Sequence, residues 1–252
     1  MKRVLGFAAV VAVALQGAAW AGPAEELIAG TRKECRGCDL TDVSFKKANL
    51  EGVDLTGATL SGASFHRANL RGAILDGVEA RGTNFNMIEA TGAQFRDATL
   101  VGAMFYGAQL SGADLTGADM TEARLQTARL TSARLPGVVL DRAVMRDSVA
   151  NSADFSNASI VQTNLNGARL GRSHFDGATI SYSGFVKAEI NRASFVGASV
   201  SFTDFFGADL RRARVTGAIL NGNRFTSAST REVDFDKASM SGNFMADGRV
   251  QN

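Results

Sequence analysis

Residues 48–77 read ANLEG VDLTG ATLSG ASFHR ANLRG AILDG, six consecutive units of five residues whose third residue, the centre, is always Leu or Phe. This spacing continues from Leu40 to Met245 and gives 42 central positions. Alanine stands two positions before the centre in 27 of them, and glycine stands two positions after it in 19. A period of five fits neither an α-helix nor a β-strand. The backbone must therefore turn once per unit, with the centre and the alanine facing inward.

The units Ala48-Asn49-Leu50-Glu51-Gly52 and Ala113-Asp114-Leu115-Thr116-Gly117 resemble the pentapeptide-repeat family, whose consensus is approximately A-(D/N)-L-x-x. The resemblance covers about five-sixths of the chain. It implies a right-handed four-sided β-helix with four units per coil. We therefore expect an all-β protein, a right-handed four-sided β-solenoid over residues 35–245. About ten coils at the spacing of β-strands give a rod about 50 Å long.

The phenylalanines support four sides. With a coil of 20 residues, the twelve phenylalanine centres fall on two opposite sides and the other two sides carry aliphatic centres, apart from Ala80, Ala90, Ala150 and Thr230. A single unit cannot bury its own centre, so the centres are buried only when neighbouring coils stack on one another. The expected core ladder on the two aromatic sides includes Phe45, Phe65, Phe85 and Phe105 on one side, and Phe155, Phe175, Phe195 and Phe235 on the other.

Residues 1–21 have the pattern of an export signal. Lys2 and Arg3 precede an apolar run from Val4 to Leu15, and a cleavage site of the A-x-A type ends at Ala21. We expect cleavage before Gly22, no membrane span afterwards, and a periplasmic or secreted protein; an uncleaved anchor or a lipoprotein is the alternative. Removing two of the 27 basic residues leaves 25 bases against 25 acids. A neutral mature chain gives no reason to expect nucleic-acid binding.

The two ends of the solenoid differ. Residues 22–34 form a cap segment in which Pro23 to Lys33 predict a short helix over the first coil. Residues 246–252 form only a short tail, which predicts that the last coil is open. Because open β edges invite association, the C-terminal coil with Phe244 and Met245 is a candidate surface for a homodimer.

Cys35 and Cys38 are the only cysteines. In an exported protein such a pair predicts a disulfide, and both residues fall on inward positions of the first coil. Free thiols are one alternative. The other is a C-x-x-C redox site, for which the usual context of strand and helix is missing.

No other pattern indicates catalysis. His66 and His174, the only histidines, lie several coils apart on opposite sides and cannot share a metal or a catalytic triad. The recurring acids, such as Asp54 and Asp114, occupy the position where the family favours Asp or Asn. We expect no catalytic residue, no metal site and no cofactor.

Three outward-facing groups of residues remain. The first group is a basic belt of five arginines on outward positions: Arg124, Arg129, Arg134, Arg142 and Arg146. Only Asp141 opposes their charge locally. We interpret the belt as a solvated surface rather than a nucleic-acid groove. One side displays many serines and threonines, a lattice of the kind that contacts polysaccharide or ice, but charges interrupt it. The third group is apolar: Tyr182 and Phe202 share one corner, and Val186 and Phe206 lie on the adjoining side.

Exposed apolar residues are the more informative deviation, because outward positions of the repeat should be polar. We interpret Tyr182, Val186, Phe202 and Phe206 as one patch that binds a protein partner; the alternative is that these side chains only cover neighbouring turns. The expected function is an exported, non-enzymatic scaffold. The family's gyrase-protecting DNA mimics suggest another function, which charge and export disfavour, and a C-x-x-C redox protein is a third. The small residues between Arg146 and Ser152 leave open a bend in the rod.

Overall fold

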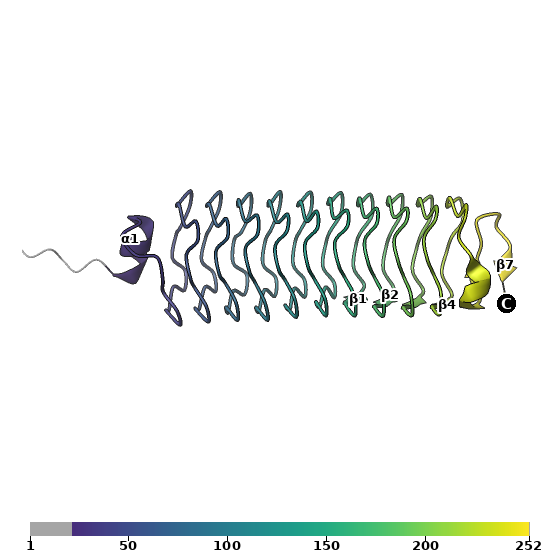
Figure 1. Cartoon of the computed structure of the whole chain (residues 1–252), viewed down its shortest axis with the longest axis horizontal. Helices are drawn as coiled ribbons and strands as arrows, with labels where there is room; N and C mark the ends of the chain where they lie inside the picture. Colours follow the sequence, from purple (N-terminus) through teal and green to yellow (C-terminus); the bar gives the residue numbers. More distant parts are fainter. Residues whose placement is uncertain (1–21, 252) are drawn as a thin grey trace, which may run out of the picture.

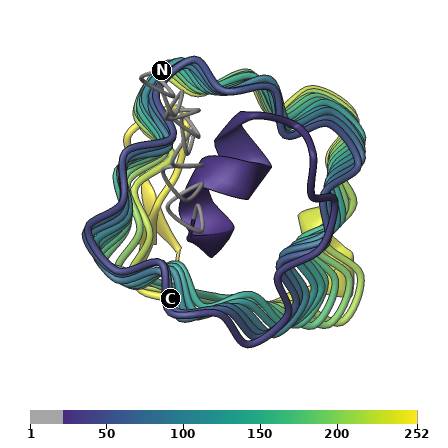
Figure 2. The same ribbon diagram turned by 90° about the vertical axis from the view of Figure 1, so that its left-hand side faces the viewer.

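The computed structural model describes residues 22–251 as a straight rod of stacked coils (Figure 1) with a four-sided outline when viewed along its axis (Figure 2). Parallel bridges join residues that are twenty apart, for example Asp54 to Ile74 and Ile74 to Gln94. Each coil therefore contains four five-residue units. The four-sided β-solenoid expected from the repeat is confirmed.

One unit, residues 53–57, shows why the repeat folds this way. All five of its backbone N–H groups are hydrogen-bonded, as groups removed from water must be. Val53 donates to Leu50 in the turn, Asp54 to Lys33 in the preceding coil, Leu55 and Gly57 to Ile74 and Asp76 in the following coil, and Thr56 to the side chain of Asp54. The Asp at this position thus satisfies an N–H group that the coil stacking leaves over.

The corner of each unit needs a residue with positive φ. The Ala58 N–H closes one such turn on the Leu55 carbonyl at 2.9 Å, and Gly57 between them has a φ of 66°. Glycine adopts this conformation at no steric cost, which explains its frequency two positions after the centre. Other residues adopt it here as well, among them Tyr182 and Phe202.

In the later coils, one side of the rod forms regular parallel strands. They make a five-stranded parallel sheet of β1 (Ser159–Val161), β2 (Thr179–Ser181), β3 (Ser199–Ser201), β4 (Ile219–Asn221) and β5 (Ser239–Ser241), in that order. Two residues after each of these strands, a buried polar residue takes the place of the usual inward alanine. We call these residues the inner polar row: Thr163, Ser183, Thr203, Asn223 and Asn243.

The inner polar row changes the corner beside it. In an earlier coil the Ala143 N–H closes the turn on the Leu140 carbonyl at 2.9 Å. One coil on, the Thr163 N–H instead donates to the hydroxyl of Ser183 at 3.0 Å, and the Thr163 hydroxyl donates to Leu140 at 2.7 Å. The backbone before the corner is then free to stay extended, which gives the strand.

The core is a continuous column of centres and small residues. The rings of Phe45, Phe65 and Phe85 stack at 4.8 and 5.2 Å between centroids, the spacing of the coils. On the opposite side Phe155 and Phe175 stack at 5.0 Å. Rings from the two sides also meet edge to face across the core, in the pairs Phe85–Phe95, Phe95–Phe105 and Phe175–Phe185.

The N-terminal end carries helix α1 (Pro23–Ile28), which lies across the opening of the first coil (Figure 2). Leu27 points into the core and is only 1% exposed. An apolar face of one helical turn is thus enough to cover the end of the rod. The export signal predicted for residues 1–21 lies outside the described residues.

The C-terminal end differs from the expectation of a bare last coil. A 3-10 helix, η1 (Phe235–Lys237), replaces one side, so Phe235 leaves the core ladder, is only half-buried, and meets Phe225 edge-on at 5.6 Å. The tail then folds back, because β7 (Val250–Gln251) pairs antiparallel with β6 (Asn243–Phe244). The hairpin provides hydrogen bonds for part of an edge that would otherwise remain unpaired.

The stretch of small residues from Arg146 to Ser152 does not bend the rod. Val149 bridges to Arg129 and Arg169 in the neighbouring coils, and Ala150 is fully buried. Ser148 is also fully buried, and among residues 22–251 its hydroxyl has no hydrogen-bond partner. The backbone ladder alone keeps the coils in register here.

Candidate functional site

The most exposed aromatic feature is a ring pair at one corner of the rod. The rings of Tyr182 and Phe202 stack with centroids 5.1 Å apart and planes 14° from parallel, although the two residues are 63% and 52% exposed. Phe202 in turn lies over the next residue of the corner, Gly222, which has no side chain to hinder it. We call Tyr182 and Phe202 the aromatic pair.

The fold holds the aromatic pair between two ordered elements. Each ring follows a strand, β2 or β3, and precedes a member of the inner polar row, Ser183 or Thr203. The Phe202 N–H donates to the Asn221 carbonyl at 2.8 Å. The corner is therefore fixed on both sides, and little conformational entropy remains to be lost when a partner covers it.

Phe206 belongs to a different environment. The guanidinium carbon of Arg224 lies 5.0 Å from the centre of its ring, and Arg224 also pairs with Asp204. Asp204 stands between Phe202 and Phe206 along the coil. The predicted apolar patch therefore includes a charged pair beside Phe206, and its members Val186 and Phe206 are half-buried.

The two cysteines lie in the first coil, where their Sγ atoms are joined in a disulfide with the Cα atoms 5.4 Å apart. Cys35 is 1% exposed and belongs to the core. Its backbone N–H donates to the Asp54 carbonyl in the following coil. The bridge is thus part of the packed N-terminal end.

Neither the histidines nor the acids form a cluster. His66 and His174 lie far apart along the rod, on opposite sides. Asp54, Asp114 and Asp154 each accept a hydrogen bond from the backbone two residues on, which is a role in the turn. Over residues 22–251 there is no group of three metal-ligating side chains. The same part of the chain has no helix long and apolar enough to span a bilayer.

The basic belt is less basic than the sequence indicates. Arg134 pairs with Asp114, Arg142 with Glu122, and Arg146 with Asp147. Most of these carboxylates come from the preceding coil, twenty residues away, so reading along the chain overlooks them. The opposing residue named from the sequence, Asp141, instead accepts a hydrogen bond from Ser159.

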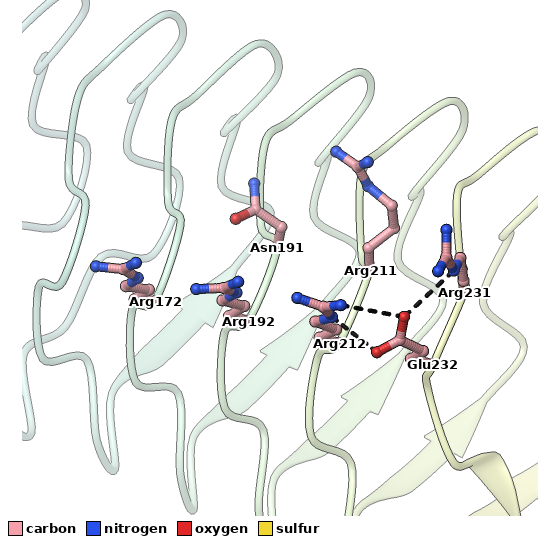
Figure 3. A pocket seen from close by; sticks show the side chains of 7 residues that line it. All are labelled: Arg172, Asn191, Arg192, Arg211, Arg212, Arg231 and Glu232. Carbon is pink, nitrogen blue, oxygen red and sulfur yellow. Dashed lines mark hydrogen bonds and ion pairs between the residues drawn. The ribbon is translucent and has the colours of Figure 1, made fainter.

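A second basic feature was missed in the sequence. Arginines and one acid line a hollow of about 280 Å³ at the corner opposite the aromatic pair (Figure 3). We call it the arginine hollow, and its lining residues are Arg172, Asn191, Arg192, Arg211, Arg212, Arg231 and Glu232. Its signal is visible only when every twentieth residue is compared, because Arg172, Arg192 and Arg212 then follow one another.

Taken together, these features define a solenoid with ordered surface groups and no clustered catalytic side chains among the described residues. Comparison with family profiles gives the family: segments matching "Pentapeptide repeats (8 copies)" overlap to span residues 38–242. The chain belongs to the pentapeptide-repeat family, as its resemblance indicated.

Solved structures of the family are similar to this chain. HetL, a pentapeptide repeat protein involved in heterocyst differentiation regulation from the cyanobacterium Nostoc sp. strain PCC 7120, is 26% identical over 88% of this chain and 95% of its own, with a TM-score of 0.63. Full-length QnrB1, a plasmid-mediated fluoroquinolone resistance protein, is 18% identical over 85% and 94%, with a TM-score of 0.31. Rfr23 from the cyanobacterium Cyanothece is 24% identical over 57% and 92%, with a TM-score of 0.23. A search of curated proteins found no match.

Proposed function

We propose that this protein is an exported, non-enzymatic scaffold that binds another protein through the aromatic pair and the neighbouring Phe206. The observation that carries the proposal is the ordered stack of Tyr182 on Phe202, in which both residues remain more than half exposed to solvent. Rings of this kind supply a large contact area at small entropic cost, and Tyr and Arg are enriched among the residues that dominate binding energies.

The surroundings of the aromatic pair support a protein partner over a small molecule. The rings stand on a convex corner, whereas sites for small ligands are concave. Arg224, stacked on Phe206 and paired with Asp204, adds a polar group at the edge of the apolar surface. An apolar centre with a polar rim is the usual composition of a protein interface. HetL, a similar rod, is involved in regulating differentiation.

Capture from the extracytoplasmic fraction of the producing cell tests this proposal. The double variant Tyr182→Ser/Phe202→Ser should capture less than about a tenth of the partner that the wild type captures, a tenfold loss that corresponds to about 1.4 kcal/mol of binding free energy. The partner is identified by mass spectrometry and retested as a purified protein. Tyr106→Ser is the matched control, since Tyr106 is 53% exposed and lies several coils away. Equal capture by the double variant and the wild type would exclude the aromatic pair as the binding surface.

Export is part of the proposal and has its own test. The mass of the protein recovered from the periplasm or medium should correspond to a chain that begins at Gly22. A mass that includes residues 1–21 would indicate an anchored protein and would move the binding surface to the membrane.

The other functions considered for the sequence have direct assays. Gyrase supercoiling in the presence of an inhibitor should be unaffected by the protein, because a chain with 25 acids, 25 bases after removal of residues 1–21, and an arginine hollow lacks the acidic surface of a DNA mimic. Reduction of a test disulfide should not be accelerated by the Cys35–Cys38 pair, since Cys35 is buried in the core. Protection of supercoiling against the inhibitor, or faster reduction of the test disulfide, would replace the scaffold proposal.

Association through the C-terminal coil remains a prediction. Phe244 is half exposed there, beside the β6–β7 hairpin. Light scattering of the purified protein should show a dimer that Phe244→Ser converts to a monomer; a monomer in the wild type would contradict this prediction.

A further inference from the structure

Arg172, Arg192 and Arg212 occupy the same corner position in three successive coils (Figure 3). Residues in this relationship are one strand spacing apart, about 4.8 Å. Figure 3 shows the three side chains in a row pointing the same way, with Arg211 and Arg231 in a second row above them. Five guanidinium groups therefore face one hollow.

The charges of the arginine hollow are not balanced within the protein. Glu232 is the only acid in its lining, and it pairs with Arg212 at 2.7 Å and with Arg231 at 3.2 Å. The hydrogen bond from Arg212 lowers the pKa of Glu232, so this carboxylate is charged at neutral pH. Arg211 pairs with Asp209 outside the lining.

Two arginines of the row, Arg172 and Arg192, form no ion pair with any described residue. Among residues 22–251, no carboxylate lies within 4.0 Å of the nitrogens of Arg172 or Arg192. By contrast, the chain pairs Arg142 and Arg224, which face a single carboxylate one coil away. Neighbouring guanidinium groups at one coil spacing repel each other unless an anion lies between them.

We propose that the arginine hollow binds a multivalent phosphate, a ligand with two or more adjacent phosphate groups, across Arg172 and Arg192. The planar guanidinium donates two parallel hydrogen bonds to phosphate oxygens, and a row of them matches a row of phosphates. The volume of about 280 Å³ suits a short phosphate chain or a phosphorylated headgroup. Asn191, which precedes Arg211 in the upper row of Figure 3, adds an amide donor. This site lies away from the aromatic pair and does not depend on the proposed protein partner.

Calorimetric titration of the purified protein with sodium tripolyphosphate tests the site. Arg172→Gln/Arg192→Gln should weaken binding at least tenfold (~1.4 kcal/mol per tenfold), and it breaks no ion pair, so the unfolding midpoint should stay unchanged. Arg124→Gln/Arg129→Gln removes the same charge from two exposed arginines that make no ion pair with any described residue. This control should bind within about twofold of the wild type.

Glu232→Gln should change the affinity for tripolyphosphate in the opposite direction. It releases Arg212 and Arg231 toward the ligand and should tighten binding several-fold, which a purely structural role of the row does not predict. Orthophosphate, which reaches only one step of the row, should bind at least tenfold (~1.4 kcal/mol per tenfold) more weakly than tripolyphosphate.

A vesicle experiment distinguishes a lipid headgroup from a soluble phosphate as the ligand of the arginine hollow. Sedimentation with phosphatidylcholine vesicles, with and without cardiolipin, shows whether the site also takes a lipid headgroup. Cardiolipin-dependent sedimentation that Arg172→Gln/Arg192→Gln abolishes assigns a lipid; tripolyphosphate binding alone assigns a soluble ligand; both support the site. No saturable binding by the wild type, equal weakening by the Arg124/Arg129 control, or weaker binding by Glu232→Gln would overturn the proposal.

Discussion

The ring of Phe202 covers Gly222: a Cβ atom at Gly222 would lie 2.8 Å from two ring carbons of Phe202. Such a distance is not compatible with real side-chain contacts, so Gly222 is required for Phe202 to lie where it does. The aromatic pair therefore depends on three successive coils, with Tyr182 on one face of the Phe202 ring and Gly222 on the other.

Gly222→Ala should destabilise the protein and displace the Phe202 ring. The strain of a positive φ contributes about 1 kcal/mol, and the clash with the ring adds to it. Gly102→Ala is the matched control, because Gly102 occupies the same corner with a φ of 66° and nothing within 4 Å of its Cβ. Urea unfolding should give a larger loss for Gly222→Ala than for Gly102→Ala. Equal losses would mean that the ring moves without cost.

The inner polar row should contribute more to stability than its small side chains suggest. The Asn223 side chain donates to the Val200 carbonyl at 2.9 Å and accepts the Thr203 N–H at 3.0 Å, in a fully buried position. Asn223→Ala leaves both groups unpaired and should cost about 2–4 kcal/mol. Thr83→Ala, which removes a single bond to Leu60, should cost about 1 kcal/mol. A smaller loss for Asn223→Ala than for Thr83→Ala would contradict the role of the row.

Ser148→Ala should stabilise the protein. The hydroxyl of Ser148 is buried without a partner among the described residues, so its removal eliminates a desolvation penalty of about 1 kcal/mol. Ser173→Ala should have the opposite effect, because the equally buried Ser173 hydroxyl donates to the Leu170 carbonyl at 2.6 Å. Thermal unfolding of the two variants provides the comparison. A lower midpoint for Ser148→Ala would show that its hydroxyl is hydrogen-bonded after all.

Asp209 should make stability depend on pH. The hydrogen bond from the Arg211 side chain holds the pKa of Asp209 below its ordinary value. A carboxylate whose pKa is lower in the folded state stabilises fully above about pH 4, and this stabilisation is lost as the pH falls through the folded-state pKa. Asp209→Asn should therefore cost less than about 1 kcal/mol at pH 7 and almost nothing near pH 2. A difference that persists on acidification would point to packing instead of charge.

The sequence predicts the core almost completely, since one periodic signal determines the coil length, the inward positions and the phenylalanine sides. Two features escape it for physical reasons. Contacts in this fold join residues twenty apart, so the ion pairs of Arg134 and Arg142 and the row of Arg172, Arg192 and Arg212 appear only when coils are aligned. The last coil is not predicted because, within residues 22–251, no further coil stacks on it to impose the repeat, and local hydrogen bonding there forms η1 and the β6–β7 hairpin.

The candidate surface is partly predictable in the same way. Tyr182 and Phe202 are recognisable as exposed rings one coil apart, because their register is known from the repeat. The charged pair beside Phe206 depends on where the Arg224 side chain lies, which is over the ring and against Asp204. A pattern of residue types does not contain that choice of side-chain conformation.

The most direct test of the scaffold proposal is photo-crosslinking in the producing cell with a benzophenone amino acid in place of Phe202, compared with the same group in place of Tyr106. Both positions are about half exposed, so general proximity affects them equally. The proposal predicts one specific protein adduct from position 202 and none from position 106. The same adducts from both positions, or none from position 202, would contradict binding through the aromatic pair.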